Sequence, residues 1–253
     1  MRMGKKLACL SAGLIVALSA GACGGDAEEA AATLGATRPQ ALARVVLPAL
    51  HKLGVNRIDL MLLSHADADH AGGALAVSRG LKVTRVISGD PPGLPAILRA
   101  EACENGRQWQ WDGVRFTTWH WAGATDGNQA SCVLRIEAAG ERLLLTGDID
   151  SRAEQALLAS DMALRAEWLL APHHGSRGSS SQALLAQVAP HAALISRGQH
   201  NAFGHPHAEV LARYRAVSAD LYDSVEQGAV LIRLGVFAPA QGLRHRARFW
   251  REK

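Results

Sequence analysis

Four side chains that commonly bind metals stand within six residues of one another: His65, Asp67, Asp69 and His70. They directly follow the apolar run 58–63, which is typical of a strand buried on both faces. Imidazole and carboxylate groups are ligands that zinc and manganese accept. A capped helix start with acidic residues near the helix dipole explains one Asp but not the two flanking His. The cluster therefore predicts a metal site at the end of this strand.

Two further polar clusters also follow apolar runs. Asp148 follows the run 143–145, and the pair His173 and His174 follows the run 168–170. Because α/β folds place their sites where strands end, we expect these side chains to join the first cluster. A simple turn would also explain Asp148 alone, whereas paired His after a buried strand favour a ligand role.

The chain around these clusters mixes strands with helices. We expect strands at residues 58–63, 83–88, 168–171, 192–196 and 229–234, hairpins at 108–119 and 131–146, and helices at 41–53, 74–79, 151–159, 181–188 and 208–217. Ser151 is expected to cap the helix at 151–159, with Glu154 completing a capping box. Hairpins mixed with helices favour a layered α/β domain over a doubly wound sheet.

The ends of the chain differ in composition from its middle. Residues 1–25 combine a basic head, an apolar run and small residues before Cys23, which is typical of a secretory signal or a lipoprotein signal. The apolar run is short for a membrane span. We expect a linker at 26–40, the main domain at 41–240 and a basic tail at 241–253. These features predict a bacterial protein that is exported to the periplasmic side or associated with the inner membrane through its N-terminus. A wrong start site or a piece of a longer protein is the alternative.

Charge and cysteine content limit the function classes. The formal net charge of +4 permits a polyanionic partner but does not by itself indicate one. Four Cys without a C-x-x-C pair exclude a structural zinc finger. If the domain is exported, a disulfide between Cys103 and Cys132 becomes feasible, although sequence does not supply their distance. The tail at 244–253 is basic with interleaved aromatic residues, so it is either a single-strand-binding segment or a solvated tail.

Five motifs in order carry a resemblance to a known family. They are Ser64-His65-x-Asp67-x-Asp69-His70-x-Gly72-Gly73, Asn128-x-x-Ser131, Leu145-x-Gly147-Asp148, His173-His174-Gly175-Ser176 and Asn201-x-x-Gly204-His205-Pro206. Over about residues 41–235 the chain resembles the C-terminal hydrolase domain of ComEC-type competence proteins, which has the metallo-β-lactamase fold. Those proteins import single-stranded DNA during natural transformation. The resemblance implies an αββα sandwich, but the D-x-G-Q-G-D and D-T-G stretches of the family's opening strands do not occur here, so the N-terminal strands are expected to be incomplete.

The resemblance also implies a ligand set for two divalent cations, zinc or manganese. His65 and Asp67 would hold one cation, and Asp148 would bridge to the other. Asp69, His70 and one of His173 or His174 would hold that second cation. Two cations about 3.5–4 Å apart activate a water and stabilise both oxygens of a displacement at phosphorus. Asn128 stands where many superfamily members have a further His.

Roles for the remaining motif residues follow from the same resemblance. Asp69 would orient the attacking water, and His205 would protonate the leaving oxygen or contact phosphate, although a loop His beside a Pro is the alternative. Substrate contacts are expected from Asn128, Ser176, Arg177 and Asn201, of which Ser176 and Arg177 also fit an exposed loop and helix cap.

These residues predict a metal-dependent phosphodiesterase or nuclease whose partner is DNA. One alternative is a small-molecule hydrolase acting on lactones or β-lactams, with His120 as a distant substitute ligand. The other is a catalytically inactive DNA-binding remnant. No protein partner follows from the sequence.

Overall fold

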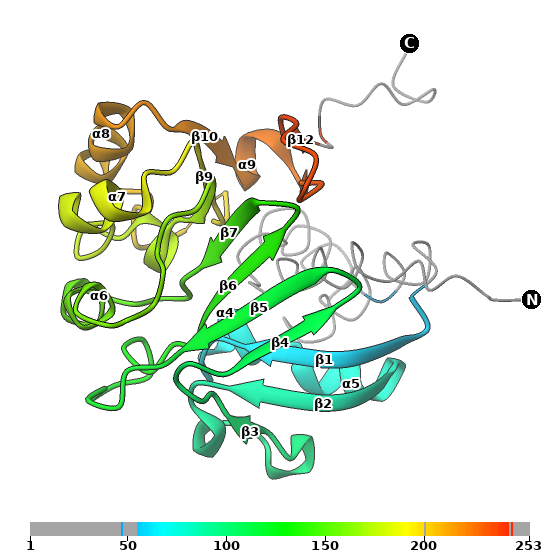
Figure 1. Cartoon of the computed structure of the whole chain (residues 1–253). Helices are drawn as coiled ribbons and strands as arrows, with labels where there is room; N and C mark the ends of the chain where they lie inside the picture. Colours follow the sequence, from blue (N-terminus) through cyan, green and yellow to red (C-terminus); the bar gives the residue numbers. More distant parts are fainter. Residues whose placement is uncertain (1–46, 48–54, 200, 243, 245–253) are drawn as a thin grey trace, which may run out of the picture.

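The computed structural model describes residues 47, 55–199, 201–242 and 244 (Figure 1). The expected signal-like segment 1–25, the linker 26–40, the helix 41–53 apart from Leu47, and most of the tail 241–253 lie outside the described residues. The expectation that the N-terminal strands are incomplete also concerns residues outside the described part of the chain. Within the described ranges, the helices fall short of the length and hydropathy that a membrane crossing requires.

Two sheets form the centre of the molecule. The small sheet is parallel and has the order β1-β2-β3, with bounds β1 Arg57–Leu63, β2 Lys82–Ser88 and β3 Glu101–Ala102. The large sheet has the order β10-β9-β8-β7-β6-β5-β4. Its bounds are β4 Gln108–Trp111, β5 Val114–Trp119, β6 Val133–Ala138, β7 Glu141–Leu145, β8 Trp168–Leu170, β9 Ala192–Ile195 and β10 Asp220–Asp223.

The large sheet is antiparallel on one side and parallel on the other. β4 to β7 form two successive hairpins, whereas β7 to β10 run parallel and are joined by helical crossovers. Both hairpin turns have positive φ angles at their two central residues, Asp112-Gly113 and Ala139-Gly140. Such turns match the twist of the flanking strands, which explains why these dipeptides set the register.

Helices cover the outer faces of both sheets. Their bounds are α4 Ala68–Ala71, α5 Ala74–Gly80, α6 Ser151–Leu158, α7 Gln182–Val188, α8 Ala208–Ala216 and α9 Ser224–Gln227. Short 3-10 turns lie at η2 Pro91–Gly93, η3 Ala96–Leu98 and η4 Pro172–Gly175, and β11 Val230–Leu231 pairs with β12 Gln241–Gly242. Figure 1 shows α6, α7 and α8 on one side of the large sheet and α5 against the small sheet.

Three apolar clusters fill the spaces between these layers. Leu144, Leu169 and their neighbours pack against α6, α7 and α8, and Met61 and Val77 belong to the cluster between the small sheet and its helices. The third cluster joins the two sheets face to face through residues such as Ile87. The layers therefore follow the order helix, sheet, sheet, helix, and the expected αββα sandwich is confirmed.

The structure corrects two details at the ends of elements. The N-cap of α6 is Asp150, not Ser151, because the Asp150 side chain accepts hydrogen bonds from the backbone of Arg152 and Ala153. Glu154 forms no capping box, since its buried carboxylate accepts the backbone N–H groups of residues 180 and 181 instead.

The last part of the domain also differs from expectation. The strand expected at 229–234 is reduced to Val230–Leu231, which pairs with β12 outside the two main sheets. The edge of the large sheet is formed instead by β10, which the apolar pattern did not reveal. An edge strand of four residues has only one packed neighbour strand, so its apolar signal is weak.

Cys103 and Cys132 form a disulfide, with their Cα atoms 5.8 Å apart. Cys103 follows β3 of the small sheet, and Cys132 directly precedes β6 of the large sheet. The bond therefore links the two sheets covalently, and the pairing that the sequence left open is present.

Candidate metal centre

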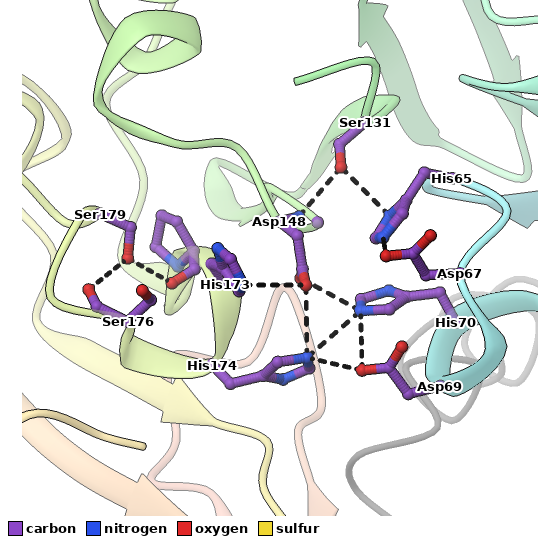
Figure 2. A network of polar contacts seen from close by, with 12 residues as sticks. His65, Asp67, Asp69, His70, Ser131, Asp148, His173, His174, Ser176 and Ser179 are labelled. Carbon is purple, nitrogen blue, oxygen red and sulfur yellow. Dashed lines mark hydrogen bonds and ion pairs between the residues drawn. The ribbon is translucent and has the colours of Figure 1, made fainter. Parts of the chain in front are cut away.

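The three polar clusters converge because their strands end at the same side of the molecule. His65 follows β1, Asp148 follows β7, and His173 and His174 lie in η4 directly after β8. Figure 2 shows Asp148 among side chains from the loop after β1, from α4 and from η4. The face-to-face packing of the two sheets thus brings together residues that lie about a hundred positions apart in the chain.

Asp69, His70, Asp148 and His174 each offer one ligand atom, and these four atoms lie within 4.8 Å of one another. His70 Nε2 is 3.1 Å from Asp148 Oδ1, and His174 Nε2 is 3.2 Å from Asp69 Oδ2. The two Nε2 atoms themselves are 3.3 Å apart. Two nitrogens and two carboxylates that converge at these distances match the donor set that a divalent cation of the zinc or manganese type takes.

A second donor pair lies beside the first group. His65 Nε2 is 3.5 Å from Asp67 Oδ2, and His65 is fully buried while Asp67 is exposed. Within the described residues, His65 Nε2 has no hydrogen-bond partner. A buried polar atom without a partner costs about 1–3 kcal/mol, and a cation held between His65 and Asp67 would remove this cost. The residues present therefore fit a second cation.

The Nδ1 atoms of three imidazoles each contact a serine residue. His70 Nδ1 lies 2.8 Å from Ser64 Oγ, and His65 Nδ1 lies 3.3 Å from Ser131 Oγ. His174 Nδ1 donates to the backbone carbonyl of Ser196 at 2.8 Å. A ring that donates through Nδ1 presents the lone pair of Nε2 to a cation, so these contacts orient the rings for ligation.

Ser131 connects the two halves of the centre, because its Oγ also accepts the backbone N–H of Asp148 at 3.0 Å. The sequence did not single out Ser64, Ser131 or Ser196 as site residues. Ser64 and Ser131 stand inside the quoted motifs, which was the available signal. Nothing in the pattern around Ser196 pointed to its role, since it supplies only a backbone carbonyl.

The backbone is left-handed at two places in the centre, namely at Gly147 and at the pair His173 and His174. Gly147 has a φ of +58°, and a Cβ there would lie 2.7 Å from Ser64 Cβ and 2.8 Å from Ser131 Cβ. Glycine at this position therefore lets β7 deliver Asp148 against both serines. His173 (φ 49°) and His174 (φ 54°) are both left-handed, which costs roughly 1–2 kcal/mol per residue. Strain of this kind is concentrated at functional sites.

In the metal-free protein, the ionisable groups of the centre shift one another's pKa values. Burial raises the pKa of Asp148, but the hydrogen bond and charges of the surrounding His side chains outweigh it and bring that pKa well below its usual range. Burial lowers the pKa of His174, yet Asp69 and Asp148 outweigh burial and raise it to about 9. The pKa of His65 is lowered by burial and by His70, which favours the neutral ring that a cation needs.

Of the paired His, His174 joins the four-residue group and His173 does not. His173 Nε2 lies 3.9 Å from Asp148 Oδ2, and its ring is 5.7 Å from that of His205. His205 therefore borders the centre behind His173. Burial and the neighbouring His173 lower the pKa of His205. Asn201 accepts the His205 backbone N–H and donates to its carbonyl, both at 2.8 Å, so its side chain holds the loop.

The other expected substrate contacts lie at the margins. Gly127, next to Asn128, is close enough that a Cβ would sit 3.6 Å from Asp67 Oδ1, so this loop borders the second donor pair. Arg177 is paired with Glu209 at 2.9 Å on the exposed surface.

Ser176 and His120 make backbone contacts outside the centre. The Ser176 carbonyl accepts the buried Ser179 hydroxyl at 2.9 Å, while His120 contacts the Gly89 carbonyl at 3.1 Å. The structure brings neither Arg177, Ser176 nor His120 into the ligand cluster.

Comparison with known proteins gives one family and several relatives. The family described as the metallo-β-lactamase superfamily matches residues 23–200. "Competence protein ComA" of Neisseria gonorrhoeae is 37% identical over 212 residues, which cover 82% of this chain and 30% of that protein. "Recombination protein 2" of Haemophilus influenzae is 31% identical, covering 74% and 24%. "ComE operon protein 3" of Bacillus subtilis is 29% identical, covering 75% and 26%. The chain thus spans about a quarter to a third of the length of these relatives.

Proposed function

Because the chain belongs to the metallo-β-lactamase superfamily, we propose that this metal-dependent hydrolase cleaves phosphodiester bonds of DNA and takes part in DNA uptake during natural transformation. Two of its relatives carry names that refer to competence or its operon, and a third is named for recombination. Competence and recombination are processes that handle DNA, and we extend such a role to this chain as a proposal.

The observation that carries the proposal is that a group of four metal donors, Asp69, His70, Asp148 and His174, lies beside a second donor pair, His65 and Asp67. Within the described residues, the buried Nε2 atom of His65 has no hydrogen-bond partner, and it lies 3.5 Å from Asp67 Oδ2. Two divalent cations, zinc or manganese, held by these residues would lower the pKa of a water toward about 7 and stabilise both oxygens of an in-line displacement at phosphorus.

The chain's own residues have three tasks in this reaction. Serine contacts fix the orientation of the buried imidazoles and of the Asp148 backbone, so these donor groups keep their positions relative to one another. The Asp69 carboxylate, whose side chain is exposed, would orient a water that enters from solvent. His205 borders the centre, and its lowered pKa favours a hydrogen bond from the neutral ring to the substrate over delivery of a proton.

An exported location is a further part of the proposal. The Cys103–Cys132 disulfide supports it, because disulfides persist in oxidising compartments such as the bacterial periplasm. Membrane association through the N-terminus is proposed on the composition of residues 1–25 alone.

The test is cleavage of single- and double-stranded DNA by the purified chain with Mn²⁺ or Zn²⁺, beside EDTA, and with bound metal quantified. We expect metal-dependent cleavage that Asp69→Ala and Asp148→Ala lower by about 100-fold or more. Asp161→Ala, at an exposed carboxylate, is the matched control and keeps full activity.

Two other outcomes would overturn the proposal. A metal-loaded protein that leaves DNA intact but opens lactones or β-lactams is a small-molecule hydrolase. A folded protein that binds DNA without retaining metal or cleaving any of these substrates is an inactive remnant.

A further inference from the structure

Phe203 is the most exposed of the large apolar side chains in the described part of the chain, with 82% of its surface accessible. Single exposed apolar residues are common and carry no meaning alone. Phe203 differs from the others in its position, because it stands two residues before His205 at the margin of the metal centre.

The loop that carries Phe203 is braced from within. The Asn201 side chain donates to the carbonyls of Gly198 and His205 and accepts the His205 backbone N–H. One amide therefore joins Asn201 and His205, which lie on either side of Phe203 in the sequence. A ring held on a braced loop loses little conformational entropy when a ligand packs against it.

The Phe203 ring is the outer end of a row of rings that leads to the metal ligands. It stacks on the His205 ring with centroids 5.8 Å apart and an interplanar angle of 20°. The His205 ring meets the His173 ring at 5.7 Å, and His173 Nε2 lies 3.9 Å from Asp148 Oδ2. The Phe203 ring thus contacts His205, while most of its surface remains open to solvent.

We propose that Phe203 is a stacking platform for an unpaired base of the DNA strand at the margin of the metal centre. Stacking on an aromatic ring accepts any base, because every base has a π-face. In a duplex both faces of a base are already covered, so a base must first unstack, which costs a few kcal/mol. The site therefore prefers single-stranded over double-stranded DNA. This inference rests on the proposed function.

The first experiment measures binding of a fluorescent single-stranded oligonucleotide by anisotropy in EDTA, so that binding is read without turnover. Loss of a base–aromatic stack weakens affinity by about 5- to 150-fold, which is the expectation for Phe203→Ala. Phe203→Trp is expected to restore affinity. Phe237→Ala is the matched control, since Phe237 is also exposed, at 63%, but belongs to the segment after β11. Equal affinities of Phe203→Ala and wild type would overturn the inference.

The second experiment identifies the base. Abasic sites are placed one at a time along the oligonucleotide, and each is bound by wild type and by Phe203→Ala. At the stacked position the two losses are not additive, because either change alone removes the same contact. Losses that simply add at every position would mean that Phe203 acts on the fold and not on a base.

The inference and the proposed function fail in different ways. If the metal-loaded wild type does not cleave DNA but Phe203 still governs binding in EDTA, only the proposed function is lost. If cleavage occurs and Phe203→Ala changes neither the KM for single-stranded DNA nor its preference over duplex, only the inference is lost. A wild type that binds no DNA in either condition overturns both.

Discussion

The imidazoles of His70 and His174 are each contacted at both ring nitrogens. His70 and His174 direct Nε2 toward Asp148, while their Nδ1 atoms contact Ser64 Oγ and the Ser196 carbonyl. Removal of such outer contacts typically lowers metal affinity by 10- to 100-fold. The serines therefore contribute to the centre by orienting the rings of its ligands.

The raised pKa of His174 predicts how stability depends on pH in the metal-free protein. Its folded pKa of about 9 lies above the usual 6.5, so its stabilising contribution is full below pH 6.5 and is lost as pH rises through 9. We expect the free energy of unfolding, measured with urea in EDTA, to fall from pH 6.5 to pH 9. His174→Gln should remove most of this fall, whereas His191→Gln, at an exposed ring, should keep it.

Added metal should oppose this trend, because a ligand imidazole must be deprotonated and metal therefore binds more tightly as pH rises. A metal-free wild type whose stability is level between pH 6.5 and pH 9 would contradict the assigned shift.

At the scale of elements, the ends of β1, β7 and β8 position the ligands, and glycine permits their contact. Gly147, two residues after the end of β7, has a left-handed backbone and leaves room for Ser64 and Ser131. Behind this point Glu154 on α6 accepts two backbone N–H groups from the loop that leads into α7. A side chain of the crossover helix α6 thus fixes the end of the loop that leads from η4 into α7.

Gly147→Ala is expected to disturb the centre more than its small size suggests. The left-handed backbone costs roughly 1–2 kcal/mol, and overlap with the two serines adds a packing cost of about 1–3 kcal/mol. Chemical denaturation should show both costs, and metal affinity should fall with them. Gly106→Ala is the control, because Gly106 has a φ of +73° but nothing within 4 Å of the added carbon. Equal losses in the two variants would show that the serine contacts carry no weight.

At the scale of the whole molecule, the centre lies where two sheets meet, so its geometry depends on how they dock. An apolar cluster with members on both sheets joins them, and the Cys103–Cys132 bond adds a covalent link. His65 follows β1 of the small sheet, and Asp148 follows β7 of the large sheet. Sliding of one sheet on the other would therefore separate Asp148 and His174 from the donors that follow β1.

The disulfide closes a loop with a sequence separation of 29. Chain-entropy arguments give about 3–4 kcal/mol of stabilisation for such a loop. We expect Cys103→Ser/Cys132→Ser to lower the free energy of unfolding by this amount, and reduction of the wild type to have a similar effect. Reductant should not change the stability of the double variant. A wild type whose stability is insensitive to reduction would contradict the assigned bond.

Much of the fold and most of the ligand cluster could be predicted from the sequence. The apolar runs before His65, Asp148 and His173 are local signals of buried strands, and local periodicity reports burial directly. The ordered motifs then indicated the αββα sandwich. The same signals were weak for β10 at the sheet edge, and the cap of α6 was misplaced by one residue because Asp150 and Ser151 are both good capping residues.

Only the tertiary structure decided which residues of distant motifs meet. It brings His174 and not His173 into the four-residue group, because two consecutive left-handed residues turn the pair apart. It also pairs Cys103 with Cys132, and it places Phe203 at the end of a row of rings. The position of each of these side chains depends on how the sheets dock or how a loop is folded. Sheet docking and loop geometry produce no periodic pattern in the sequence, so the sequence did not reveal these contacts.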